Sequence, residues 1–272
     1  DTLAEGSAAL GQDLAALMRD GPQDDLDLTA NTQPVMLCAG IACYRAWRAE
    51  GGAEPAAVAG HSLGEYSALV VAGVLTLADA LKLVRFRAQA MQQAVPVGSG
   101  AMAAVLALEP AQVVEGCAKA AAESGEVVAA ANFNDPRQTV ISGSVAGVDK
   151  AREVLKAMGA KRVVNLPVSA PFHCSLMRPA AEALRQRLAD VAFAVPRIPL
   201  VNNVDVVVQT DADAIRDALY RQAFGAVRWV EVVQALRARG LSHVVECGPG
   251  KVLTGMVKRI DADAQVLALS DP

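Results

Sequence analysis

The fold is decided by one stretch in the first third of the chain, Gly60-His61-Ser62-Leu63-Gly64-Glu65-Tyr66-Ser67-Ala68-Leu69. It follows a short apolar run at 56–59 and continues into an apolar helical segment. A G-x-S-x-G sequence between a strand and a helix is typical of a nucleophile elbow, and Gly60 and Gly64 permit a turn that a Cβ would crowd. The helix would direct unpaired N–H groups at Ser62, where a developing oxyanion is stabilised. We therefore predict that Ser62 is a nucleophile; the alternative is an ordinary strand-to-helix turn.

Length and composition limit the class of protein. A chain of 272 residues is long for one compact domain, so a large unit with a smaller inserted or appended one is expected. Hydrophobic residues make up 53% and aromatic residues only 4%, which suits strands of Ala, Val and Leu covered by helices. A net charge of -4 with mixed signs argues against nucleic acid as a partner. The five cysteines lack metal-ligand spacing and indicate free thiols in a reducing, cytoplasmic compartment. No apolar run is long enough to span a membrane.

The order of expected elements predicts an α/β fold with two domains. Residues 99–166 predict the order β-α-β-β-α-β, the ferredoxin-like arrangement, with strands at 101–108, 126–132, 138–142 and 161–166 and helices at 110–124 and 145–158. Strands and helices also alternate on both sides, in 1–98 and 167–272, which indicates one large domain interrupted by a small one. The alternative is that the inner strands extend one large sheet.

The large domain is expected to contain further elements on both sides of the insertion. The apolar spacing predicts helices at 3–18, at 35–47 after Pro34, and from the cap Thr76 to 95, then at 176–191, 212–224, 229–239 and 251–259. Strands are expected at 56–59, 200–203, 243–247 and 266–269.

A serine nucleophile needs a base, and the chain has only three histidines. His61 precedes Ser62 and should point the opposite way and pack, and His243 opens an apolar strand. His173 lies in a proline-constrained loop that leads into a helix, so by elimination it is the predicted base. Three aspartates could orient its imidazole, and their spacing does not choose among them: Asp190, Asp205 and Asp217.

Arg87 stands out on the long helix at 76–95. It shares a mostly apolar stripe with Leu83, Ala90, Met91 and Ala94. A guanidinium on that side is costly unless it meets a carboxylate. If the carboxylate belongs to a ligand, the site selects an acyl group with a free carboxylate, which arginine binds through two hydrogen bonds. The alternatives are an internal ion pair and an arginine that extends along the apolar surface to reach water.

Several segments together resemble the malonyl-CoA:acyl carrier protein transacylases of bacterial fatty acid synthesis. They are the stretch at 60–69, Arg87, Asn132-Phe133-Asn134, the loop at 169–173, Val201-Asn202-Asn203-Val204-Asp205 and Gly248-Pro249-Gly250-Lys251-Val252-Leu253. The resemblance covers nearly the whole chain. It implies a large α/β-hydrolase-like domain interrupted by a ferredoxin-like one, with the active site in the cleft between them.

The resemblance also implies roles for individual residues. Ser62 matches the acylated nucleophile, His173 the general base and Arg87 the arginine that pairs with the malonyl carboxylate. Gln222 matches the glutamine whose backbone carbonyl orients the histidine, and the backbone N–H of Leu63 matches an oxyanion donor. The residues placed around the substrate are Phe172, whose ring would restrict substituted malonates, Met91, His61 and Asn132 at the cleft edge.

One feature of the family is not matched. The family begins with a strand and a Gly-Gln-Gly-Ser-Gln loop whose first glutamine supplies a second oxyanion donor. Gly11-Gln12-Asp13, expected inside the first helix, does not replace it. Because losing one such donor typically costs about 10² to 10³ in rate, we expect a longer active protein with this segment upstream of Asp1.

The function implied is ping-pong transfer of a malonyl group from malonyl-CoA to acyl carrier protein, by a monomer that needs no metal or redox cofactor. Lys161 and Arg162 are candidates for a basic rim that meets the acidic carrier, and a solvated strand end is the alternative. Rival functions are an acyltransferase module of a polyketide synthase, a serine thioesterase or hydrolase, and a non-catalytic carrier-binding protein.

Overall fold

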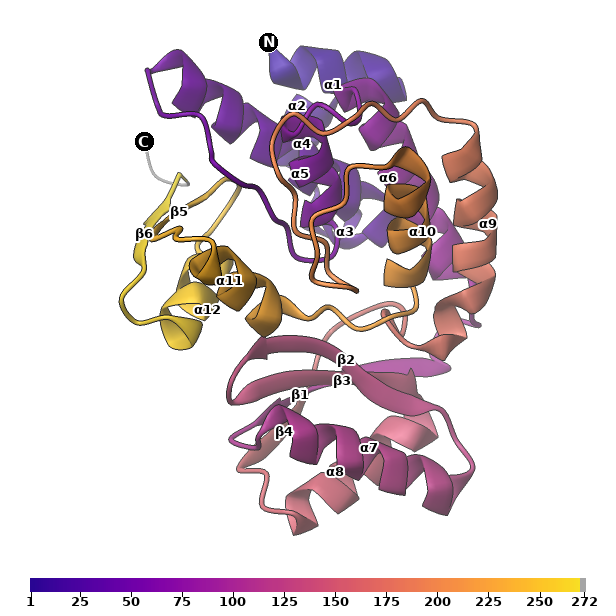
Figure 1. The fold of residues 1–272 in the computed structure, drawn as a ribbon. Coiled ribbons are helices and arrows are strands. Elements are labelled where there is room, and N and C mark those ends of the chain that lie inside the picture. The colour runs from indigo at the N-terminus through magenta and orange to yellow at the C-terminus, as the bar shows by residue number, and fades with distance from the viewer. Residues whose placement is uncertain (270–272) are drawn as a thin grey trace.

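Helix α6 (Leu77–Gln93) lies at the centre of the larger, upper part of the computed structural model, which describes residues 1–269 (Figure 1). The hydroxyl of Thr76 begins it by accepting a hydrogen bond from the N–H of Asp79 (3.1 Å), so the expected cap is confirmed. The helices packed around it are α1 (Thr2–Leu10), α4 (Thr29–Ala49), α5 (Gly64–Val71) and α9 (Arg178–Ala189). The helix that carries Arg87 is therefore enclosed on most sides.

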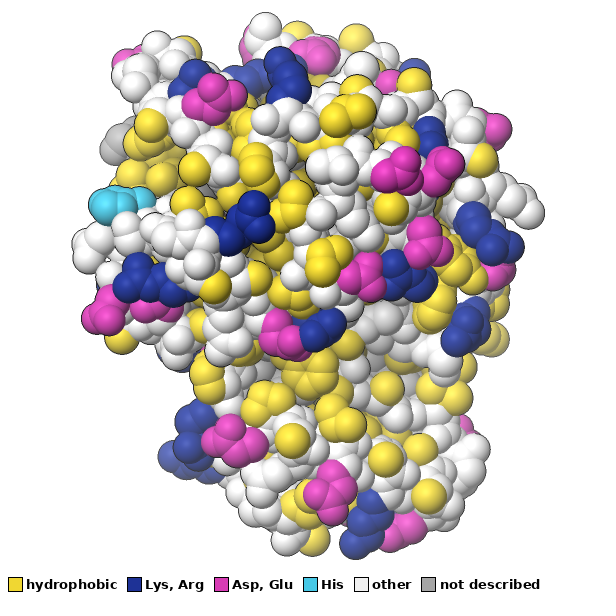
Figure 2. Space-filling view, in the orientation of Figure 1, with side chains coloured by type: hydrophobic (Ala, Val, Ile, Leu, Met, Phe, Trp, Pro, Cys, Tyr) yellow, Lys and Arg dark blue, Asp and Glu magenta, His cyan; other side chains and the backbone are white. Residues whose placement is uncertain are grey.

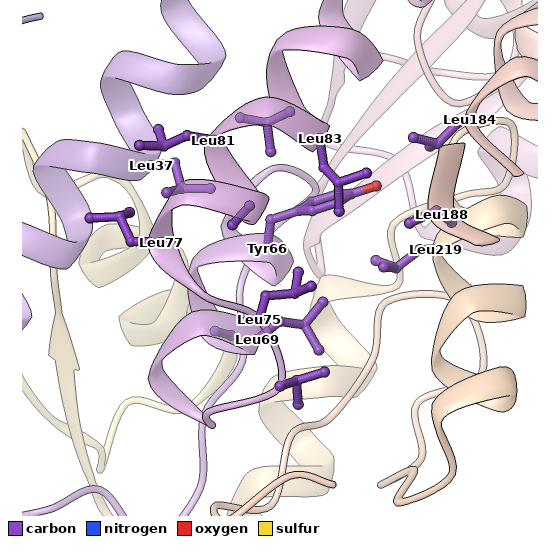
Figure 3. Close-up of a cluster of buried hydrophobic side chains, with 14 of the residues drawn as sticks. Leu37, Tyr66, Leu69, Leu75, Leu77, Leu81, Leu83, Leu184, Leu188 and Leu219 are labelled. Carbon is purple, nitrogen blue, oxygen red and sulfur yellow. The ribbon is translucent and has the colours of Figure 1, made fainter. Parts of the chain in front are cut away.

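The core of this part is aliphatic, as the composition indicates. Figure 3 shows leucines from α4, α5, α6, α9 and α10 (Ala212–Gln222) around the ring of Tyr66. Tyr66 and Leu69 are both 0% exposed, so the first turns of α5 are fixed by packing on α4 and α6. This packing sets the position of the elbow that precedes α5.

The prediction of a single helix at 3–18 is wrong, because the structure has two helices there. Gly11 ends α1 with a left-handed backbone (φ 63°), and the Asp13 side chain then begins α2 (Leu14–Asp20). The segment Gly11-Gln12-Asp13 is therefore a break between helices and does not lie inside one. The apolar spacing continues through this segment, but the caps at Gly11 and Asp13 end one helix and begin the next. A short helix, α3 (Gln23–Asp27), follows.

Helix α4 begins earlier than the sequence predicts. It includes Pro34, which was expected to precede it. A proline has no backbone N–H, and Pro34 lies past the first turn, so the helix loses one hydrogen bond there. The buried side chains of the helix hold it against α6 in spite of that loss.

The two strands expected beside the elbow are reduced to single bridges. Val58 pairs with Leu200 in parallel, and Val201 pairs with Val208. Pairing stops at once because Gly60 turns into the elbow, while the Asn202 side chain accepts the N–H groups of Asp205 and Val206 and closes a turn. Further along, the expected elements are present as α11 (Trp229–Ala238), β5 (His243–Glu246), α12 (Val252–Ile260) and β6 (Gln265–Ala268). Strands β5 and β6 pair with each other in parallel.

The lower part follows the expected order of elements. Its six elements are β1 (Gly100–Leu106), α7 (Pro110–Ser124), β2 (Val128–Asp135), β3 (Gln138–Ser144), α8 (Val145–Ala157) and β4 (Arg162–Asn165). The strands pair antiparallel in the order β2-β3-β1-β4, and α7 and α8 cover one face (Figure 1). Ala103 and Val105 point to the helices, while Met102 and Ala104 belong to a separate cluster on the other face.

The two parts meet along β2. The N–H of Phe133 donates to the Val227 carbonyl (2.9 Å), and the N–H of Val227 donates to the Ala131 carbonyl (2.8 Å). Arg259 on α12 also pairs with the buried carboxylate of Asp135 (2.6 Å). Figure 2 shows a narrowing between the parts where hydrophobic side chains are exposed, with charges of both signs on either side. No helix among the described residues has the length and apolar character to cross a membrane.

The core of the lower part yields a stability prediction. Leu155 on α8 is fully buried, whereas Val114 on α7 is 47% exposed. Leu155→Ala should lower the free energy of unfolding by about 2–5 kcal/mol, because the cavity cannot collapse between two helices and a sheet. Val114→Ala, the control, should change it by about 0.5 kcal/mol or less. Urea unfolding followed by circular dichroism measures both, and equal effects would contradict this account.

Candidate functional site

The elbow holds Ser62 in a conformation that side chains rarely adopt. Its φ is 51°, and the turn is tight because a Cβ on Gly60 would lie 1.9 Å from the carbonyl carbon of Gly64. Asn203 fixes both sides of the turn: its Oδ1 accepts the Ser62 N–H (2.7 Å) and its Nδ2 donates to the Gly60 carbonyl (2.7 Å). The backbone N–H of Leu63 has no acceptor within residues 1–269, so it is available to an oxyanion.

Ser62 and His173 are in direct contact. Ser62 Oγ lies 2.7 Å from His173 Nε2, and His173 Nδ1 lies 2.9 Å from the Gln222 carbonyl and 3.2 Å from that of Gly225. Two carbonyl acceptors require the proton on Nδ1, which leaves the lone pair of Nε2 for the serine hydroxyl. Burial, with the positive charge of Arg87, lowers the pKa of His173 to about 3. The imidazole is therefore neutral near pH 7, as a base must be.

None of the three candidate aspartates takes part. Asp205 and Asp217 both bind Arg221 (2.6 Å each), and Asp190 ends α9. The main-chain carbonyls of Gln222 and Gly225 orient His173 instead. A search of the sequence for a carboxylate partner could not identify them.

Arg87 is buried beside the nucleophile. The residue is 2% exposed, and its Nη2 lies 3.0 Å from Ser62 Oγ and 3.1 Å from Gln222 Oε1. Its Nη1 donates to Gln33 Oε1 (2.7 Å), and its Nε has no acceptor in the described part of the chain. These partners are all neutral, so neither an internal ion pair nor an arginine that reaches water, the two alternatives, is observed among residues 1–269. A buried guanidinium without a carboxylate, aimed at a nucleophile, is arranged to receive an anionic ligand group.

Sequence reasoning missed the carboxylate closest to this arrangement. Glu65 is 1% exposed, and its Oε2 accepts hydrogen bonds from Gln222 Nε2 (2.9 Å) and from the backbone N–H of Asn203 (3.1 Å). Burial raises its pKa to about 7. The signal was available: Glu65 lies on the apolar side of α5, next to Tyr66, where a charged side chain is as unusual as Arg87 is on α6.

The candidate substrate residues lie in different surroundings. Met91 is 1% exposed and follows Arg87 by one turn of α6. Phe172 packs against both the core of the upper part and the face of the lower sheet that lies opposite α7 and α8. Asn132 is buried on β2 and bridges to the Val227 segment. His61 contacts neither Ser62 nor His173 through a recorded hydrogen bond; the distance from its Nε2 to Asn134 Oδ1 is 2.9 Å. Two further candidates, Lys161 and Arg162, are exposed at the start of β4.

The family model described as an acyl transferase domain matches residues 6–267. This chain belongs to the acyl transferase family. Among its curated relatives is the malonyl CoA-acyl carrier protein transacylase of Escherichia coli (strain K12), 52% identical over 272 residues, which cover 100% of this acyl transferase and 87% of the relative. An acyl-carrier-protein S-malonyltransferase from Burkholderia pseudomallei 1710b has a similar crystal structure, with a TM-score of 0.97, 59% identity and coverage of 100% and 88%. A malonyl-transacylase in complex with its type II PKS acyl carrier protein has a TM-score of 0.97, 45% identity and coverage of 100% and 87%.

The two glycines of the elbow should differ in their tolerance of a side chain. A Cβ on Gly60 would strike the Gly64 backbone, whereas a Cβ on Gly64 would meet no atom within 4 Å. Gly60→Ala should therefore destabilise this acyl transferase by at least about 1–3 kcal/mol and abolish acylation of Ser62. Gly64→Ala, the matched control, should keep or raise the stability, since alanine favours a helix by about 0.5–1 kcal/mol. Thermal unfolding and intact mass test both, and equal losses would contradict the geometry.

The low pKa of His173 predicts a pH dependence of stability. Between pH 6.5 and about 3 the unfolded chain binds a proton at this residue that the folded protein does not. The free energy of unfolding should therefore fall as pH drops below 6.5, by up to about 1.4 kcal/mol per pH unit from His173.

The test compares wild type with His173→Gln in urea unfolding from pH 7 to 5. The variant should lose this contribution, and the shift at Glu65, which has the opposite sign, is present in both proteins. His243→Gln, at an exposed strand end, should keep the wild-type dependence. Parallel curves for wild type and His173→Gln would contradict the buried neutral imidazole.

Proposed function

We propose that this acyl transferase moves a malonyl group from malonyl-CoA to the phosphopantetheine thiol of an acyl carrier protein, supplying fatty acid synthesis. The observation that carries the proposal is Arg87, a buried guanidinium without a carboxylate partner in the described residues, 3.0 Å from Ser62 Oγ. A malonyl thioester brings such a carboxylate, two bonds from the carbonyl carbon that Ser62 would attack. The names of the relatives, which specify malonyl transfer to acyl carrier protein, support the same substrate.

The first half-reaction forms a malonyl-serine ester. His173 Nε2 takes the hydroxyl proton while Ser62 Oγ attacks the thioester carbonyl carbon. The carbonyl oxygen becomes an oxyanion at the amino-terminal end of α5, where the Leu63 N–H is available. The C–S bond then breaks, and the CoA sulfur leaves as a thiol with the proton from the imidazolium.

The second half-reaction reverses these roles. The phosphopantetheine thiol gives its proton to His173, and its sulfur attacks the ester carbonyl carbon. The C–O bond to Ser62 breaks, and Ser62 Oγ recovers the proton from the imidazolium. Throughout, Arg87 binds the malonyl carboxylate and favours malonyl over acetyl groups. These side chains and the two substrates account for every bond and proton in both half-reactions, so no metal or redox cofactor is needed.

We assign residues 1–98 and 167–272 to an α/β-hydrolase-like domain and residues 99–166 to a ferredoxin-like one. The strand order β2-β3-β1-β4 and the separate core beneath α7 and α8 support the division. The hydrogen-bonding distance between His61 and Asn134 supports an active site at the junction, since it joins the elbow to β2.

We also propose that this acyl transferase acts as a cytoplasmic monomer. A monomer is supported by the site itself, because one chain supplies Ser62, His173 and Arg87. A cytoplasmic location is supported by the five cysteines, which are all free thiols. Phe172, Met91, Asn132 and His61 would line the acyl and pantetheine path.

Acylation by two thioesters tests the assignment. With malonyl-CoA, wild type should gain one malonyl adduct, seen by intact mass, that passes to added carrier protein. Arg87→Ala should acquire it about 10²-fold more slowly or worse, because the carboxylate loses a buried charged partner, while acetylation from acetyl-CoA should change less.

Ser62→Ala is the control and should gain no adduct. Loss of the adduct to water at the same rate with or without carrier would indicate a hydrolase. Equal slowing of malonyl and acetyl transfer by Arg87→Ala would exclude the proposed selectivity.

A further inference from the structure

The side-chain amide of Gln222 lies between a buried cation and a buried anion. Its Oε1 accepts from Arg87 Nη2 (3.1 Å), and its Nε2 donates to Glu65 Oε2 (2.9 Å) and to the Ser62 carbonyl (3.0 Å). Gln222 itself is 0% exposed, so water cannot replace any of these bonds. The amide therefore links the carboxylate to the guanidinium without a direct ion pair.

An amide has a donor end and an acceptor end, so its two orientations are not equivalent. The reverse orientation would turn the NH₂ group toward the guanidinium of Arg87, which has only donors, and the oxygen toward Glu65. Glu65 Oε2 also accepts the backbone N–H of Asn203, so this oxygen acts as an acceptor, accepts the amide in one orientation and opposes the other. Glu65 and the Ser62 carbonyl both accept from Nε2, so together they fix the amide oxygen as the acceptor presented to Arg87.

A second contact of Glu65 reaches the elbow. Its Oε2 also accepts the backbone N–H of Asn203, whose side chain holds the Ser62 N–H and the Gly60 carbonyl. No cation within residues 1–269 forms an ion pair with Glu65, although burial of a carboxylate without one is costly. The hydrogen bonds from Gln222 and Asn203 are what compensate this buried carboxylate.

We infer that Glu65 is a positioning residue: through the Gln222 amide it holds Arg87 where the carboxylate of the acyl group binds, next to Ser62. The inference rests on the proposed function. It differs from a purely structural role in one respect, because it predicts a loss of preference for malonyl over acetyl groups and not only a loss of rate.

The experiment measures Ser62 acylation by quenched flow and intact mass, with malonyl-CoA and with acetyl-CoA. Glu65→Ala should lower the malonyl-over-acetyl rate ratio about tenfold, in the range of couplings within one hydrogen-bond network. Glu65→Gln should lower it less, since its Oε1 can accept both bonds. Gln222→Ala keeps the carbonyl that orients His173 and should lower the ratio as Glu65→Ala does.

Double variants test the route. Because Glu65 acts through Gln222 on Arg87, its replacement should not lower the ratio further in Gln222→Ala or in Arg87→Ala. Glu153→Gln, a carboxylate 75% exposed on α8, is the matched control and should keep both rates. If Glu65→Ala does not fold, Glu65→Gln alone and combined with Gln222→Ala gives the same comparison.

Three results would overturn the inference. If Glu65→Ala and Glu65→Gln slow acylation by malonyl-CoA and by acetyl-CoA equally, Glu65 only supports the elbow and does not position Arg87. Additive effects of Glu65 and Gln222 replacements would exclude the amide as the link. If wild type forms no malonyl adduct at all, both the proposed function and this inference fail. If wild type and Arg87→Ala behave as proposed but the Glu65 variants keep the wild-type malonyl-over-acetyl ratio, only the inference fails.

Discussion

The structure depends on the backbone at Ser62, which is held with a positive φ between Gly60 and α5. A side chain in this conformation costs on the order of 1–3 kcal/mol, so surrounding contacts must impose it. Packing of Tyr66 and Leu69 fixes the helix that follows, and Asn203 binds the turn on both sides. The serine hydroxyl then projects toward His173, and the remaining groups of the site are built against that point.

Charge in this site is arranged for a substrate that carries its own anion. Arg87, Glu65 and His173 are all nearly inaccessible to water, yet the guanidinium and the carboxylate are linked only through Gln222. A direct ion pair would satisfy Arg87 and leave it less able to bind a ligand carboxylate. The amide link holds the Arg87 guanidinium in place and leaves its charge available to a ligand carboxylate. This arrangement lowers the stability, and packing of the large aliphatic core offsets the loss.

The lower part contributes a wall rather than a catalytic group. One face of its sheet is covered by α7 and α8, and the other packs toward Phe172, one residue before the base. Its edge strand β2 pairs with the segment around Val227, which follows the carbonyls that hold His173. A shift of the lower part would therefore displace the groups that contact His173, and also His61, which precedes the nucleophile.

Features that depend on neighbours in the sequence could be predicted from the sequence alone. They include the elbow, the cap at Thr76, the order of elements in 99–166 and, because histidines are few, the candidate base. Even local reading failed where caps interrupt a continuous apolar pattern, as at Gly11 and Asp13. The resemblance implied that the Gln222 carbonyl orients His173, but only the tertiary structure brought these two groups together, gave Arg87 neutral partners and joined Glu65 to Arg87 through Gln222. These contacts connect residues 49, 54 and 157 positions apart, and hydrogen bonds between such distant groups leave no periodic trace along the chain.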